Sequence, residues 1–124
     1  MNAAKLYIVD EHPGVRAALV ERLGRAANLV VIGHGGDVDT VMTEIRSGKP
    51  DIVLLEVKRK DGMGLEILRQ IAALPRAPRM AVLTSYPTRW EEQAAIRAGA
   101  DCYLLKEIDS EELIKTIASL PISS

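Results

Sequence analysis

The stretch Asp51-Ile52-Val53-Leu54-Leu55-Glu56-Val57 is a short apolar run that ends on a carboxylate. Such a run is typical of a β-strand that is buried on both faces of a parallel sheet. We therefore expect the carboxylate of Glu56 to emerge at the carboxyl edge of that sheet. The rest of the chain decides what Glu56 meets there.

The composition limits the classes of protein to which the chain can belong. It has 124 residues, of which 48% are hydrophobic, so we expect one domain with one core. The net charge of −1 predicts no direct binding to nucleic acids or acidic membranes by this segment. Cys102 is the single cysteine, which excludes an intramolecular disulfide. No signal peptide or membrane-length apolar run is present, so we expect a cytoplasmic protein.

Apolar runs of strand length recur along the chain, and segments with helical spacing separate them. The predicted strands are Leu6–Val9, Leu29–Ile32, Ile52–Leu55, Met80–Leu83 and Cys102–Leu105.

Helix start and stop signals mark the segments between and after these strands. Thr88 and Glu91 have the spacing of a capping box, which predicts reciprocal hydrogen bonds at the start of the fourth helix. Leu65, Leu68 and Ile71 are the predicted inward face of the third helix. The predicted helices begin after His12, at Asp37, at Gly64, after Thr88 and near Asp109, and the third ends at Leu74.

Strands that alternate with helices predict an α/β fold with a parallel sheet covered on both faces. Short right-handed crossovers favour a flavodoxin-like (βα)5 doubly wound sheet with strand order 2-1-3-4-5. The crevice of such a sheet lies beyond the carboxyl ends of strands 1 and 3. We expect residues 1–121 to form this domain and residues 122–124 to be a tail or truncated linker.

Polar side chains follow four of the five predicted strands and should gather at this crevice. Three carboxylates brought together repel one another unless a cation lies among them, and their oxygens suit Mg²⁺. A hydroxyl and an ammonium group on the other side suit an anion such as a phosphoryl group. The residues concerned are Asp10, Glu11, Glu56, Thr84 and Lys106.

Each polar residue also has an ordinary structural interpretation. A lone acid at a strand end is commonly solvated or caps a helix, Thr84 alone suits a turn, and Lys106 alone suits the surface. His12 and His34 have no partner at metal spacing, and we interpret both as structural. The run Lys58–Lys60 is most simply a solvated loop. The joint placement of the acids, the hydroxyl and the lysine at one edge nevertheless favours a functional site.

From Leu6 to Leu120 the sequence resembles the receiver domain of two-component response regulators. The His12-Pro13 pair and the run Tyr103–Lys106 are most similar to the subfamily whose receivers precede a helix-turn-helix output domain. The segments that carry the resemblance are Ile8–Pro13, Pro50–Leu55, Asp61–Glu66, Val82–Thr84 and Ala98–Lys106.

The resemblance implies a role for each matching residue, a sensor histidine kinase or another signalling protein as partner, and an ability to form homodimers. It places the phosphoacceptor position at Glu56 and the phosphate-binding and switch positions at Thr84, Tyr103 and Lys106. It implies Mg²⁺ as cofactor, held by Asp10, Glu11, Glu56 and the backbone carbonyl of Lys58.

Glu56 is the main departure from the family, which has aspartate at this position. Arg59 and Lys60 also stand where the family usually has an apolar residue and then a proline. One additional methylene moves the carboxylate into the space for the phosphoryl group, and a misplacement of about 1 Å costs on the order of a hundredfold in rate. We therefore predict that Glu56 is not phosphorylated at a useful rate and that Mg²⁺ binding is weak.

Three hypotheses about function follow. In the first, the Glu56 carboxylate mimics part of a phosphoryl charge and biases the domain toward an active-like state, with Thr84 and Tyr103 drawn inward. In the second, the site is inert and the domain is an interaction or dimerisation module. The third is a Mg²⁺-dependent phosphatase or phosphotransferase, although these enzymes need an aspartate nucleophile at this position. The fourth and fifth helices are the expected partner surface, unless Trp90 simply packs across the end of its own helix.

Overall fold

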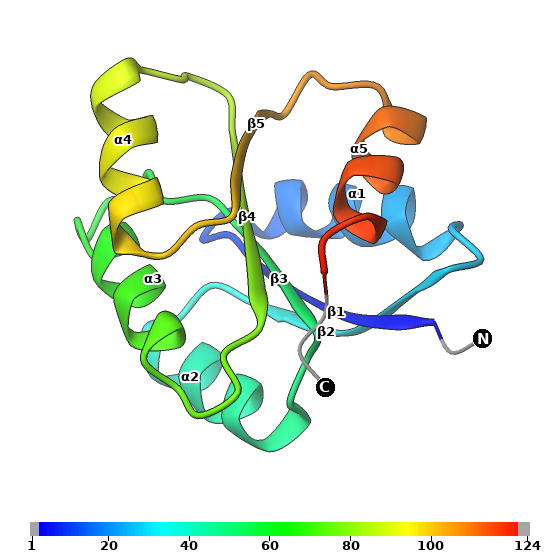
Figure 1. Cartoon of the computed structure of the whole chain (residues 1–124), viewed down its shortest axis with the longest axis horizontal. Coiled ribbons are helices and arrows are strands. Elements are labelled where there is room, and N and C mark those ends of the chain that lie inside the picture. The colour runs from blue at the N-terminus through cyan, green and yellow to red at the C-terminus, as the bar shows by residue number, and fades with distance from the viewer. Residues whose placement is uncertain (1–2, 122–124) are drawn as a thin grey trace.

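The computed structural model describes residues 3–121 as one five-stranded parallel sheet with helices on both faces (Figure 1). The strand order β2-β1-β3-β4-β5 confirms the predicted flavodoxin-like topology. The predicted tail, 122–124, lies outside the described residues. No helix within the described part is long and apolar enough to cross a membrane. The elements are β1 (Ala4–Val9), α1 (Pro13–Gly24), β2 (Leu29–Gly35), α2 (Val38–Gly48), β3 (Ile52–Leu55), α3 (Gly64–Ala72), β4 (Arg79–Thr84), α4 (Arg89–Ala98), β5 (Cys102–Leu105) and α5 (Ser110–Ala118).

Different helices cover the two faces of the sheet. Figure 1 shows α2, α3 and α4 on one side and α1 and α5 on the other. Successive residues of β1 point to opposite faces, so that Leu6 and Ile8 enter one core cluster while Tyr7 and Val9 enter the other. Burial on both faces explains why the central strand β3 is apolar throughout, whereas the edge strand β2 alternates buried with more exposed residues.

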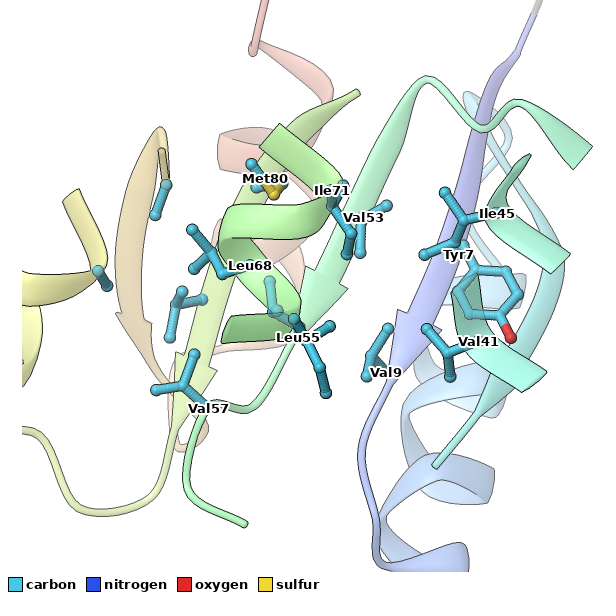
Figure 2. Packing of buried hydrophobic residues seen from close by; sticks show 14 of the residues in the cluster. Tyr7, Val9, Val41, Ile45, Val53, Leu55, Val57, Leu68, Ile71 and Met80 are labelled. Atoms are coloured by element: carbon cyan, nitrogen blue, oxygen red, sulfur yellow. The ribbon is translucent and has the colours of Figure 1, made fainter. Parts of the chain in front are cut away.

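The cluster beneath α2 and α3 is formed by direct packing of these helices on the central strands. Figure 2 shows Ile45 of α2 beside Tyr7 of β1, and Ile71 of α3 over Val53 of β3. All four of these side chains are at most 2% exposed. This packing holds β1 and β3 side by side, so that the crevice lies at their adjacent carboxyl ends.

The structure differs from the sequence-based prediction mainly at the ends of elements. β3 and β5 have the predicted bounds, but β2 continues to Gly35, since its last residues still pair with β1 up to Val9. α3 ends at Ala72, because the chain tightens into a turn in which the N–H of Leu74 donates to the carbonyl of Ile71.

The buried face of α3 is also displaced from the predicted one. Ile67 is buried together with Leu68 and Ile71, whereas Leu65 is only partly buried.

Candidate functional site

The carboxyl ends of β1, β3, β4 and β5 bring the predicted polar residues to one edge of the sheet. Asp10 follows β1, Glu56 follows β3, Thr84 ends β4 and Lys106 follows β5. Asp10 and Thr84 are fully buried, and Glu56 is 6% exposed. Burial of two neighbouring carboxylates is unfavourable unless a positive charge compensates them.

The ammonium group of Lys106 provides this charge. Its Nζ lies 2.8 Å from Oδ2 of Asp10 and 3.3 Å from Oε1 of Glu56. The backbone holds Lys106 in place, because its N–H donates to the carbonyl of Thr84 at 2.8 Å. One protein cation therefore bridges the two buried carboxylates.

Backbone N–H groups bind the other oxygens of these carboxylates. Oδ1 of Asp10 and Oε2 of Glu56 each accept from the N–H two residues further along the chain, at 2.9 and 3.0 Å. Glu11 is engaged separately, because its Oε1 accepts from the N–H of Lys60 at 2.9 Å. All three carboxylates thus have donors from the protein itself.

The pKa of Asp10 reflects these contacts. Burial raises this pKa, but the hydrogen bonds from Lys106 and from the backbone of His12, together with the charge of Lys106, outweigh burial and hold it below the ordinary 3.8. Asp10 is therefore ionised at neutral pH, as an ion pair with Lys106 requires.

This arrangement does not fit a magnesium site built on three carboxylates. Within residues 3–121, no group of three or more His, Cys, Asp or Glu side chains is placed to hold a metal ion. Mg²⁺ demands near-octahedral geometry and free oxygen ligands. Here Lys106 lies between Asp10 and Glu56, and Glu11 is turned to the backbone of Lys60.

A second ion pair ties the loop after Glu56 to α4. Nζ of Lys58 lies 2.6 Å from Oε2 of Glu91 and also donates to the carbonyl of Tyr86 at 2.5 Å. The hydroxyl of Tyr103 donates to Oε1 of Glu91 at 2.5 Å. Glu91, which is 8% exposed, therefore joins this loop to both α4 and β5.

The capping-box prediction for Glu91 is wrong. Thr88 does cap α4, since its side chain accepts from the N–H of Glu91 at 3.0 Å. However, the N–H of Thr88 donates to the hydroxyl of Tyr103 at 3.3 Å, and the Glu91 carboxylate binds Lys58 and Tyr103. Helical periodicity in the sequence could have indicated that Glu91 is buried, because Glu91 shares the buried face of α4 with Ala94 and Ala95.

The prediction that Lys58–Lys60 is a solvated loop is also wrong for its first two residues. Lys58 is paired with Glu91, and the side chain of Arg59 is only 4% exposed. Arg59 donates to the carbonyl of Gly36 at 2.6 Å, which anchors the loop against the segment before α2. Long cationic side chains can cover a core while their charged ends find partners, so a run of charge need not be solvated.

The predicted switch residues lie near Glu56 but are bonded elsewhere. The hydroxyl of Thr84 accepts from the N–H of Tyr86 at 3.3 Å. Tyr103 is half-buried, and burial, followed by its hydrogen bond to Glu91, raises its pKa above the usual range. Trp90 is 69% exposed, so it does not pack across the end of its helix.

We expect Glu91→Ala to lower the free energy of unfolding by about 1–3 kcal/mol, because Tyr103 loses its acceptor and Lys58 loses its charged partner in a largely buried place. Urea unfolding followed by circular dichroism measures this change. Glu92→Ala is the matched control, since Glu92 is the next residue along the chain and is exposed. The control should stay within about 0.5 kcal/mol of the native chain. Equal losses in the two variants would show that the Glu91 contacts add no stability.

A doubly wound parallel sheet with buried acids, a hydroxyl and a lysine at its carboxyl edge defines the receiver class of signalling domain. Residues 6–118 match the family model described as the response regulator receiver domain. The chain belongs to this family. It is a receiver domain of the NarL/LuxR type of two-component response regulator.

Its relatives include a transcriptional activator and response regulators. The DNA-binding transcriptional activator DevR/DosR of Mycobacterium tuberculosis is 35% identical over 91% of this chain and 52% of that protein. The nitrate/nitrite response regulator protein NarL of Escherichia coli is 26% identical over 92% of this chain and 53% of that protein. A LuxR-family two-component response regulator from an Aurantimonas species has a TM-score of 0.86 at 26% identity, over 99% of this chain and 90% of that chain. The chain spans about half the length of the curated relatives it matches.

Proposed function

We propose that this domain is an interaction module that works without phosphorylation, with Glu56 as a fixed charge at the acceptor position. The observation that supports this most strongly is the ion bridge from Lys106 to Asp10 and Glu56. Lys106 already compensates one of these two buried negative charges and contacts both carboxylates, so a metal ion gains less here than in an acidic pocket without a lysine. Mg²⁺ binding is weak in this proposal, because the ion must displace Lys106 from two carboxylates at once.

The contacts of Glu56 favour an inert charge over a mimic of phosphorylation. A mimic should draw in the hydroxyl of Thr84, but that hydroxyl is bonded to the backbone of Tyr86. The second carboxylate oxygen of Glu56 binds the N–H of Lys58, within its own loop. In addition, the Tyr103 hydroxyl is held by Glu91 at the start of α4. Glu56 therefore contacts its own loop and Lys106, while the hydroxyls of Thr84 and Tyr103 are bonded to other partners.

The partner in this proposal is a second copy of the domain, an output domain or another signalling protein such as a sensor histidine kinase. Since one relative is named a DNA-binding transcriptional activator, we place the domain in a transcription regulator. The region around α4 is the proposed contact surface, because it exposes large side chains. Tyr86 is 74% exposed, Trp90 69% and Ile96 47%.

Self-association of the native chain, Glu56→Gln and Glu56→Asp tests this function. We expect the dimerisation constants from sedimentation equilibrium to agree within about twofold, because a fixed charge that does not contact the hydroxyls of Thr84 and Tyr103 shifts no population between their two states. Amide chemical shifts of α4 should also agree in the native chain and Glu56→Gln. If Glu56→Gln lowered the dimerisation constant tenfold or moved the α4 shifts, Glu56 would be a mimic of phosphorylation and the proposed function would be wrong.

A further inference from the structure

A groove of about 680 Å³ lies at the edge of the sheet opposite to Glu56. The start of β1, the end of α2 and the loops that lead into β3 and β4 form its walls. Its floor is apolar and rigid, because three prolines contribute to it. The apolar lining residues are Ile45, Pro50, Leu74, Pro75, Ala77 and Pro78.

The rim of this groove is strongly cationic. Lys5, Arg46, Lys49 and Arg76 line it, and all four are exposed. Within residues 3–121, none of these four makes an ion pair of 4.0 Å or less. Asp51 is the one acid in the lining, and its Oδ2 accepts from the N–H of Lys5 at 2.8 Å. The charge of the groove is therefore opposite in sign to the net charge of −1 on the chain.

The backbone of the groove is unusual at two of these cations. Lys49 has φ 48° and Arg76 has φ 55°, and they are the two non-glycine residues with positive φ in the described part of the chain. Glycine or asparagine normally occupies such positions, at a helix end or after a proline in a turn. Both residues nevertheless line the same groove with cationic side chains, where glycine would have offered none.

We propose that this groove binds a small organic polyanion, a molecule with two or more negative charges on an apolar or aromatic body. Its volume lies within the range of sites that enclose small ligands. The proline-rich floor takes the apolar body, while the lysines and arginines on the rim bind the charges. The site is independent of Glu56 and of the proposed function.

The dye bis-ANS, which carries two sulfonates on an aromatic body, is the probe for this site. We expect one dye to bind per chain, and Lys49→Asn/Arg76→Asn to weaken binding at least tenfold. Asparagine tolerates the left-handed conformation, so this variant loses charge without added backbone strain. Lys60→Gln/Arg97→Gln is the matched control, because it removes two exposed charges outside the groove. Its affinity should stay within about twofold of the native value.

Two further ligands separate the contributions of charge and apolar body. N-phenylnaphthylamine has the apolar body without charge, and pyrophosphate has the charge without the body. We expect each to bind at least about tenfold more weakly than bis-ANS. The proposal is wrong if Lys49→Asn/Arg76→Asn binds bis-ANS as tightly as the native chain, or if the control loses as much affinity. If the neutral dye bound as tightly as bis-ANS, the groove would be an apolar surface without preference for charge, and the proposal would also be wrong.

Discussion

Glu56→Asp should gain the mass of one phosphoryl group when it is incubated with acetyl phosphate and Mg²⁺, whereas the native chain should gain none. The shorter side chain withdraws the carboxylate from Nζ of Lys106, which lies 3.3 Å from Oε1 of Glu56. This withdrawal leaves room for the phosphoryl group and restores an in-line approach. Because a misplacement of about 1 Å costs on the order of a hundredfold in rate, the native and variant chains should differ by at least that factor. Intact mass spectrometry over a time course measures both.

Glu56→Gln is the control for phosphorylation at another residue, since it keeps the shape of the native side chain without a nucleophilic oxygen. Asp10 and Glu11 are present in all three chains, so an adduct on either would appear in every sample. An adduct on Glu56 of the native chain would overturn the proposal that the fixed charge is inert. If Glu56→Asp stayed unmodified, the obstacle would instead be the loop, in which the side chain of Arg59 is buried and Lys58 is paired with Glu91.

The fold could be predicted from the sequence because local patterns decide it. Pro13 begins α1 and Asp109 caps α5 as predicted. The apolar run at Ile52–Leu55 is the central strand, since it pairs with both β1 and β4. Once strands and helices alternate, right-handed crossovers leave few topologies. The Lys106–Asp10 pair spans 96 residues, and its approach could be predicted because both residues follow parallel strands.

The contacts of the loop after β3 could not be predicted in this way. Lys58 reaches Glu91 across 33 residues, and Arg59 reaches Gly36 across 23. Loop side chains have no periodicity, so their partners depend on how the finished fold places distant segments. The cationic groove could not be predicted either. Lys49 and Arg76 have positive φ, although glycine or asparagine is the usual residue in that conformation.

Lys106→Met should lower the free energy of unfolding at neutral pH by about 3 kcal/mol, because it leaves two buried carboxylates without their shared cation. The side chain of Lys106 is 15% exposed and that of Asp10 only 1%, so water cannot replace the lost contact fully. Urea unfolding followed by circular dichroism measures this change. Lys115→Met, on the exposed side of α5, is the matched control and should stay within about 0.5 kcal/mol of the native chain.

The pH dependence of this loss identifies its electrostatic origin. The pKa of Asp10 in the folded chain lies below the ordinary 3.8, so its ion pair stabilises the fold above that pH and ceases to do so as the pH falls through the folded pKa. In Lys106→Met the pKa of Asp10 rises, because the hydrogen bond and the charge of Lys106 no longer oppose the effect of burial. The stability difference between native and variant chains should therefore be full at neutral pH and shrink as the pH falls toward and below 3.8. A difference that stayed constant with pH would point to lost packing of the lysine side chain and not to lost charge.

Glu56→Gln in the Lys106→Met background distinguishes the contribution of Glu56 to stability from that of Asp10. If the charge of Glu56 is part of the buried cluster, removing it relieves repulsion with Asp10, and the double variant should be more stable than Lys106→Met alone. In the native background the same change removes a contact with Lys106, so it should be neutral or destabilising. Such a difference in effect between the two backgrounds is the signature of direct coupling in a double-mutant cycle. Equal effects in both would mean that Lys106 serves Asp10 alone and that Glu56 is no part of the buried charge cluster.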